Sequence, residues 1–157
     1  CFQKKSSFLI VPLYRYYNPK IVDHFYTASW TELGNGKDGW KLEGVQCRIM
    51  KCKASESVPL YRYCKSGLDH FYTTNIKEIG TATPGNVGNH GYKSEGITGY
   101  CYPVKKAGTI PLYRYWHPRF VNHFYTTNAK EIGTTTSGQV GKYGYKSEGI
   151  TCYVFPN

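Results

Sequence analysis

Three of the five histidines occur in the same local sequence, and they are the residues best suited to chemistry. His24, His70 and His123 each begin a His-Phe-Tyr-Thr motif. Histidine binds metals, and three histidines around a common axis would suit zinc. However, no second type of metal ligand accompanies each histidine, and the cysteines form no Cys-x-x-Cys pair. We therefore expect these side chains to hydrogen-bond neighbouring strands, with no bound metal and no other cofactor.

An acid or amide precedes each histidine, and aromatic residues lie nearby. Tyr17 and Trp116 stand just before the loop that leads to the motif, where the second copy has Cys64. A polar group beside an aromatic ring is typical of sugar binding, because the ring stacks on C–H groups while the polar group takes hydroxyls. The candidate ligand-binding residues are Tyr17, Asp23, His24, Asp69, His70, Trp116, Asn122 and His123. An equally good interpretation is that Asp and Asn close a turn.

A Pro-Leu-Tyr-Arg-Tyr motif precedes each histidine motif, and a Glu-Gly-Val or Glu-Gly-Ile motif follows it. Strand alternation places the Leu and Arg of the first motif on one face and its two Tyr on the other. The Leu residues and the Phe of each histidine motif are expected in the core. Because an unpaired buried charge is costly, we predict one ion pair per copy. The pairs are Arg15–Glu43, Arg62–Glu95 and Arg114–Glu148.

Catalysis has little support in this sequence. It contains no nucleophile elbow and no His-Glu-x-x-His motif. A glycosidase needs two carboxyl groups in one cleft, one of them with a raised pKa. Here the repeated acids are assigned to ion pairs, and the same residues occur three times, whereas a catalytic centre occurs once. We expect a protein that is not an enzyme.

The elements that must position these residues are strands. Each copy is expected to contain a hairpin formed by the first two motifs, then a helical turn such as residues 75–80, a Gly-rich loop and a third strand. The copies span about residues 9–50, 56–103 and 108–155 of a single domain, 1–157. Closing three such units would remove free sheet edges. The predicted fold is all-β and disulfide-stabilised, with a pseudo-threefold axis, β-trefoil-like or propeller-like, and at most short helical turns.

Together the motifs resemble a family of extracellular repeats of unassigned function. That family carries Pro-x-Tyr-Arg-x-Tyr, then His-Phe-Tyr-Thr, then Tyr/Lys-x-Glu-Gly-Ile, often in threes, and the similarity covers roughly residues 9–155. The resemblance implies a secreted binding or accessory module and implies no catalytic residues. Copy one departs from the pattern, with Ala28 in place of the second Thr and Trp40 in place of a Tyr.

Composition narrows the class of partner. The 157 residues carry a net charge of +10 and are 17% aromatic, which excludes a disordered chain. The sequence contains no run of about 18 apolar residues, so no membrane span is predicted. The chain begins at Cys1 without Met, as expected of a processed, secreted protein. The even number of cysteines predicts disulfides among Cys1, Cys47, Cys52, Cys64, Cys101 and Cys152, with Cys1–Cys152 as a candidate clasp.

These observations favour a secreted, lectin-like, carbohydrate-binding module. The alternative is a cationic extracellular structural, surface-active or defence protein that binds polyanions through charge and aromatic residues. The expected partners are glycans or acidic extracellular polymers. An enzyme or an enzyme inhibitor is less favoured, and nucleic acid is not an expected partner, because the basic residues form no single run. The oligomeric state stays open.

Overall fold

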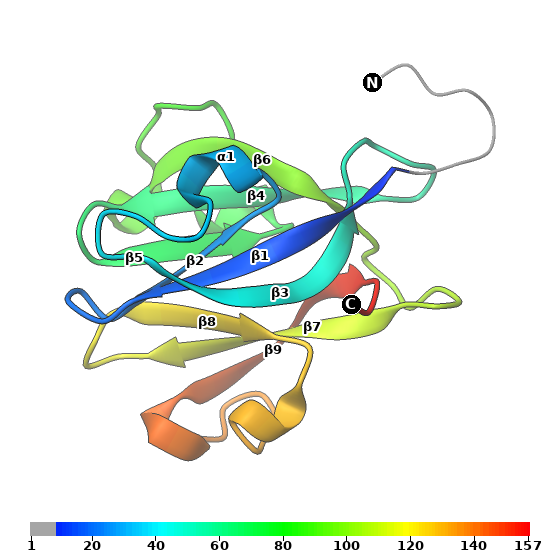
Figure 1. Cartoon of the computed structure of the whole chain (residues 1–157). Coiled ribbons are helices and arrows are strands. Elements are labelled where there is room, and N and C mark those ends of the chain that lie inside the picture. Colours follow the sequence, from blue (N-terminus) through cyan, green and yellow to red (C-terminus); the bar gives the residue numbers. More distant parts are fainter. Residues whose placement is uncertain (1–8) are drawn as a thin grey trace.

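A computed structural model describes residues 9–157, and strands dominate it (Figure 1). The strands are β1 (Ile10–Asn18), β2 (Asp23–Thr27), β3 (Lys41–Met50), β4 (Val58–Lys65), β5 (Asp69–Thr73), β6 (Lys93–Cys101), β7 (Ile110–His117), β8 (Asn122–Thr126) and β9 (Lys146–Val154). The helical segments are single turns: α1 (Trp30–Leu33), η1 (Ile76–Glu78), η2 (Asn89–Gly91), η3 (Ala129–Glu131) and η4 (Lys142–Gly144). The predicted all-β class is confirmed. Among the described residues, no helix is long and apolar enough to cross a membrane.

Each sequence copy folds into a strand trio with its first strand in the middle. In every trio the first strand pairs antiparallel with the second as a hairpin and with the third on its other side. The two sheets have the orders β2-β1-β3-β6-β4-β5 and β8-β7-β9. Figure 1 shows the larger sheet strongly curved, with β7, β8 and β9 of the smaller sheet lying below it in this view. This curvature turns the inner faces of all three hairpins toward one core.

Three tyrosines join the hairpins at the centre of this core. Tyr26, Tyr72 and Tyr125, each from a histidine motif, are about 1% exposed. The Tyr26 hydroxyl donates to the Tyr125 carbonyl at 2.7 Å and accepts from the Tyr125 N–H at 2.7 Å. The Tyr125 hydroxyl bridges Tyr72 in the same way, and the Tyr72 hydroxyl bridges Tyr26. The hydrogen bonds therefore form a closed ring that satisfies buried backbone groups of three strands.

Simple strand alternation describes these strands only in part. Leu13 is buried as predicted, but Tyr16, expected on the opposite face, is fully buried as well. The pairing of β1 with β3 shifts register on both sides of Arg15, and such irregularities bend a strand. The Tyr16 hydroxyl donates to the carbonyl of Gly34, so this face is covered by the chain after α1. All five residues of β2 are buried, because both of its faces are packed.

The predicted helical turn after the second strand is present. Asn75 caps η1, and its side-chain oxygen accepts a hydrogen bond from the N–H of Lys77. Asn128 caps η3 in the same way. In copy one the corresponding segment is α1, where the Ser29 side chain makes no capping hydrogen bond. These turns carry glutamates that reach neighbouring trios.

Candidate functional site

The boundaries between strand trios are built around arginine. Arg15 Nε donates to Glu43 of its own trio at 2.9 Å, which is the pair that the sequence analysis proposed. Its two terminal nitrogens donate to both carboxylate oxygens of Glu131, from copy three, at 3.0 Å. The guanidinium carbon also lies 5.0 Å from the ring centre of Phe124. Arg15 therefore fastens two trios together through hydrogen bonds to both glutamates and a cation–π contact.

The same joint occurs at the other two boundaries. Arg62 contacts Glu95 and the Glu32 carboxylate of copy one, and Arg114 contacts Glu148 and the Glu78 carboxylate of copy two. We refer to the boundaries as joint 3/1 (Arg15), joint 1/2 (Arg62) and joint 2/3 (Arg114). The sequence analysis missed the second glutamate. The sequence feature that could have revealed it is the glutamate in each helical turn, which is followed along the chain by the arginine of the next copy.

Threonine fixes that second glutamate in place. The hydroxyl of Thr126, the last residue of its histidine motif, donates to Glu131 at 2.6 Å. Thr27 and Thr73 donate to Glu32 and Glu78 in the same manner. Burial alone would raise the pKa of Glu131, but hydrogen bonds from Arg15 and Thr126 lower it below its usual value. The pKa values of Glu32 and Glu78 are lowered in the same way, so these three carboxylates are ionised at neutral pH.

The acid or amide before each histidine is buried and faces the next copy. Asp23 Oδ2 lies 2.6 Å from Nδ1 of His70, and Asp69 Oδ2 lies 2.5 Å from Nδ1 of His123. The third pair joins the Asn122 side-chain nitrogen to Nδ1 of His24, at 3.0 Å. Asp23 and Asp69 are 1% exposed and Asn122 is 0% exposed. These three side chains position the histidines and present no surface to a ligand, contrary to their place among the candidate ligand-binding residues.

The three histidines do not share one charge state, because two of them face a carboxylate and the third faces an amide. At joint 1/2, burial disfavours a charged His70, but the Asp23 carboxylate outweighs this and raises the pKa of His70 to about 10. His123 beside Asp69 also has a raised pKa, against the effect of burial. At joint 3/1, burial and the nearby Arg15 lower the pKa of His24 to about 3. His24 is thus neutral at pH 7, whereas His70 is protonated.

Clefts of different size open at the three joints. Beside the histidines, the cleft at joint 3/1 has a volume of about 440 Å³, that at joint 2/3 about 350 Å³ and that at joint 1/2 about 170 Å³. A separate cleft of about 560 Å³ opens at joint 1/2 beside Thr27, Glu32 and Arg62. Trp40, the copy-one residue that replaces a Tyr, lines the cleft beside His70 and packs 5.7 Å from the ring of that histidine. Aromatic residues line the cleft beside His24 at joint 3/1: Tyr17, Phe120, Phe124, Tyr143 and Tyr145.

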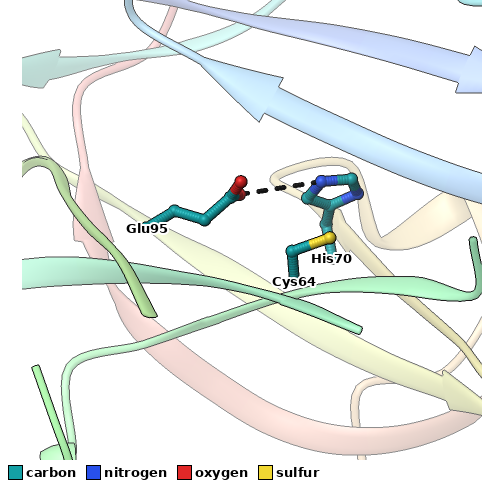
Figure 2. Close-up of side chains that lie close together, drawn as sticks. All are labelled: Cys64, His70 and Glu95. Carbon is teal, nitrogen blue, oxygen red and sulfur yellow. Dashed lines mark ion pairs between the residues drawn. The ribbon is translucent and has the colours of Figure 1, made fainter. Parts of the chain in front are cut away.

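Beside each histidine lies a residue that differs among the copies. The ring centres of Tyr17 and His24 are 4.8 Å apart, and those of Trp116 and His123 are 4.5 Å apart. Copy two has Cys64 instead, whose thiol lies beside His70 and Glu95 (Figure 2). Of the eight candidate ligand-binding residues, Tyr17 and His24 thus line the cleft at joint 3/1, and His70 and His123 line the clefts beside them at joints 1/2 and 2/3. Trp116 lines none of these three clefts.

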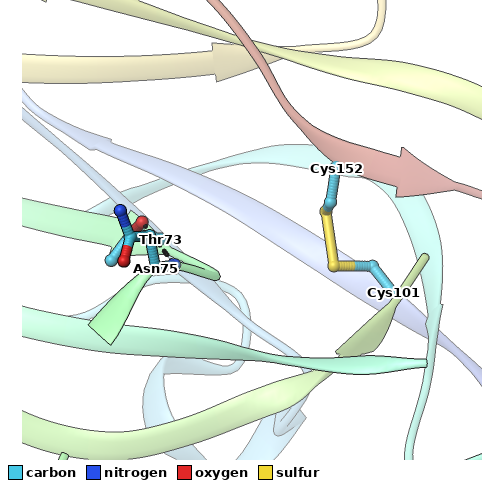
Figure 3. Close-up of a disulfide and its surroundings, with 4 residues drawn as sticks. All are labelled: Thr73, Asn75, Cys101 and Cys152. Atoms are coloured by element: carbon cyan, nitrogen blue, oxygen red, sulfur yellow. Dashed lines mark hydrogen bonds between the residues drawn. A yellow bond between two sulfur atoms is a disulfide. The ribbon is translucent and has the colours of Figure 1, made fainter. Parts of the chain in front are cut away.

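The cysteines depart from the expected pairing. Cys152 forms a disulfide with Cys101, which links β9 to β6, so Cys1–Cys152 is wrong (Figure 3). Cys1 itself lies outside the described residues. Cys47 and Cys64 are free thiols, although we expected disulfides. Cys47 is 0% exposed in the core beside the disulfide, and burial raises the pKa of its thiol to about 12. Cys52 is disulfide-bonded.

These features define an all-β domain with a disulfide, in which strand trios meet at buried arginine–glutamate joints beside clefts of unequal size. The chain belongs to the family described as a domain of unknown function (DUF5648), whose model matches residues 12–155. Neither the curated proteins nor the solved structures that were compared with the chain gave a match.

Proposed function

We propose that the protein is a secreted, non-catalytic, lectin-like module that binds a neutral glycan in the cleft at joint 3/1. We further infer that its three copies close around a pseudo-threefold axis. The closed tyrosine ring supports that arrangement, as does the shared hairpin register, in which Arg15, Arg62 and Arg114 stand opposite Tyr26, Tyr72 and Tyr125. The cleft at joint 3/1 is the observation that carries the proposed function.

The walls of this cleft suit the apolar faces of a sugar. Tyr143 is 79% exposed and Phe120 is 41% exposed, so both rings are open to solvent at its rim. Large exposed aromatic side chains lose favourable burial unless a ligand covers them. Tyr143 also has a positive φ of 59°, which its loop shares with His90 of copy two at 60°. The loop shape is thus common to both copies, but only copy three places an aromatic phenol there.

The floor of the cleft favours hydroxyl groups over anions. Arg15 is hydrogen-bonded to two carboxylates, Glu43 and Glu131, which offset its charge and so leave no excess positive charge for a sulfate or carboxylate. Glu43 and Glu131 remain 34% and 31% exposed, which leaves lone pairs for sugar hydroxyls. The neutral His24 adds an uncharged polar group. This combination of aromatic walls and fixed acceptors supports a neutral sugar.

The electrostatics of the joint argue against glycoside hydrolysis. A hydrolase needs a general acid with a raised pKa. Hydrogen bonds from Arg15 and Thr126 overcome burial and hold the pKa of Glu131 below its usual value. Glu131 therefore has no proton to give at neutral pH, and a binding role is the simpler use of this carboxylate.

A glycan array at 0.15 M and 0.5 M NaCl tests the proposal. Binding to one neutral sugar family at both salt concentrations is expected. Binding restricted to sulfated or sialylated glycans at low salt would instead support the polyanion-binding alternative, which the net charge of +10 favours.

Calorimetry with the best glycan then locates the site. Tyr143→Asn should weaken binding about tenfold or more, since Asn tolerates the positive φ while the stacking ring is lost. Val140→Ala is the matched control, because Val140 is 65% exposed in the same loop and does not line the cleft. Equal affinity of the two variants would contradict a site at joint 3/1.

A further inference from the structure

We propose that Cys64, His70 and Glu95 form a Zn²⁺-binding site at joint 1/2. One ligand atom from each of these residues lies within 4.8 Å of the other two. Figure 2 shows the three side chains converging from β4, β5 and β6, with the Glu95 carboxylate and the Cys64 sulfur turned toward the imidazole. The distance from His70 Nε2 to Glu95 Oε1 is 3.7 Å. Ligand atoms on a tetrahedral zinc ion lie about 3–4 Å apart, so small side-chain adjustments suffice.

The imidazole is oriented as a zinc ligand requires. His70 Nδ1 contacts Asp23 Oδ2 at 2.6 Å, and the His70 backbone N–H donates to the other oxygen at 3.1 Å. A carboxylate on Nδ1 leaves Nε2 for the metal and is the common outer partner of zinc-bound histidine. Because His70 is protonated at neutral pH, metal binding releases the Nε2 proton and the proton of the Cys64 thiol to water. Asp23 is itself buried, so this orientation is fixed before any metal arrives.

The ligand set also suits zinc chemically. Thiolate, imidazole and carboxylate are all zinc ligands, and three protein ligands leave a fourth position for water. Glu95 Oε1 accepts a hydrogen bond from Arg62 Nε at 3.0 Å, which leaves further lone pairs on the carboxylate. Arg62 is neutralised by the bidentate Glu32, so its charge is offset by a carboxylate other than Glu95.

Copies one and three contain the same frame without the thiol. His24 Nε2 lies 3.8 Å from Glu43, and His123 Nε2 lies 3.4 Å from Glu148. Tyr17 and Trp116 occupy the position of Cys64 in these copies and stack on the imidazoles. The proposed site is therefore specific to copy two, and the other copies indicate how the joint is built without a metal.

Titration of the whole protein with Co²⁺ under argon tests the site. Co²⁺ takes zinc positions, and thiolate ligation gives a charge-transfer absorption band. We expect one Co²⁺ per chain, with this band, and loss of the band when Zn²⁺ is added. Cys64→Tyr introduces the residue type that copy one has at this position, and it should abolish the band. Cys47→Ala should retain the band. Asp23→Asn should weaken affinity about 10–100-fold.

A gain-of-site variant makes the test independent of any loss of folding. Trp116→Cys adds a thiol beside His123 and Glu148, where Asp69 already orients the imidazole. Cobalt stoichiometry should then rise from one to two. Absence of a charge-transfer band in the unmodified protein, or an unchanged band in Cys64→Tyr, would overturn the proposal.

Discussion

Joints 3/1 and 1/2 are built from equivalent arginine, glutamate and phenylalanine residues, yet they present different surfaces. At joint 3/1, Asn122 leaves His24 neutral, and aromatic residues line a cleft of about 440 Å³. At joint 1/2, Asp23 charges His70, Trp40 helps to fill the cleft of about 170 Å³ beside that histidine, and a thiol replaces an aromatic ring. The wider cleft of this joint, about 560 Å³, opens beside Thr27 and Arg62 instead. One scaffold has thus been adapted to two kinds of candidate site.

The comparison teaches that the repeated residues hold the trios together, whereas the residues that differ among copies shape the candidate sites. In the histidine motif, His binds the preceding copy's acid or amide, Tyr closes the central ring and Thr fixes a glutamate. Every one of these contacts is internal. Tyr143, Trp40 and Cys64, by contrast, each occupy a position where another copy has a different residue type.

The largest expected effect comes from breaking the shared scaffold. Tyr26→Phe removes the hydroxyl that satisfies both the N–H and the carbonyl of Tyr125. Two buried backbone groups lose their partners at about 1–3 kcal/mol each, so the free energy of unfolding should fall by about 2–6 kcal/mol. Urea unfolding monitored by fluorescence measures this loss.

The same substitution elsewhere provides the controls. Tyr72→Phe and Tyr125→Phe should cost as much as Tyr26→Phe, since their hydroxyls make equivalent bonds. Tyr143→Phe should change stability by less than about 0.5 kcal/mol, because that side chain is exposed. Markedly unequal costs among the three buried tyrosines would show that the joints do not share one scaffold.

Much of the scaffold was predictable from sequence, because repeated spacing reveals strands and their partners. The hairpins, the helical turn at Asn75 and the pairing of Arg15 with Glu43 all follow from local patterns and the cost of a buried charge. The contact of Arg15 with Glu131 was missed because it joins residues 116 positions apart. The cleft was missed for a similar reason, since Tyr143 and Tyr17 meet only through the packing of copies three and one.

An intermediate effect is expected from making joint 1/2 resemble joint 3/1. In metal-free protein, Asp23→Asn removes the carboxylate that raises the pKa of His70 to about 10. The pKa of His70 should then fall below its usual 6.5, as that of His24 does beside Asn122. Stability at pH 6 should drop by about 1.5–3 kcal/mol, the usual worth of a hydrogen bond to a charged group.

The raised pKa of His70 determines how the stability difference between the two proteins changes with pH. A raised pKa in the folded state contributes stability that is complete below pH 6.5 and is lost as pH rises through about 10. The difference between the unaltered protein and Asp23→Asn should therefore be largest near pH 6 and shrink toward pH 10. Urea unfolding across this range, with histidine NMR titration, measures both quantities. A difference that grows with pH would contradict the assigned Asp23–His70 charge pair.

The smallest effect is expected from the reverse exchange, Asn122→Asp, which gives joint 3/1 the carboxylate found at joints 1/2 and 2/3. The lowered pKa of His24, about 3, contributes stability that is complete above pH 6.5 and is lost as pH falls toward 3. A carboxylate beside Nδ1 should raise the pKa of His24 and so remove the loss of stability at low pH. The variant should therefore gain on the order of 1 kcal/mol relative to the unaltered protein between pH 7 and about pH 5.5.

Histidine NMR separates the two influences on His24. The Tyr145 hydroxyl, which now accepts from Asn122, can donate to the new carboxylate as Tyr92 donates to Asp69 at joint 2/3. The variant joint thus has the partners needed to hold a carboxylate. If the pKa of His24 nevertheless stays far below 6.5, then burial and Arg15 determine its charge, and the amide at position 122 is not what distinguishes this joint from the others.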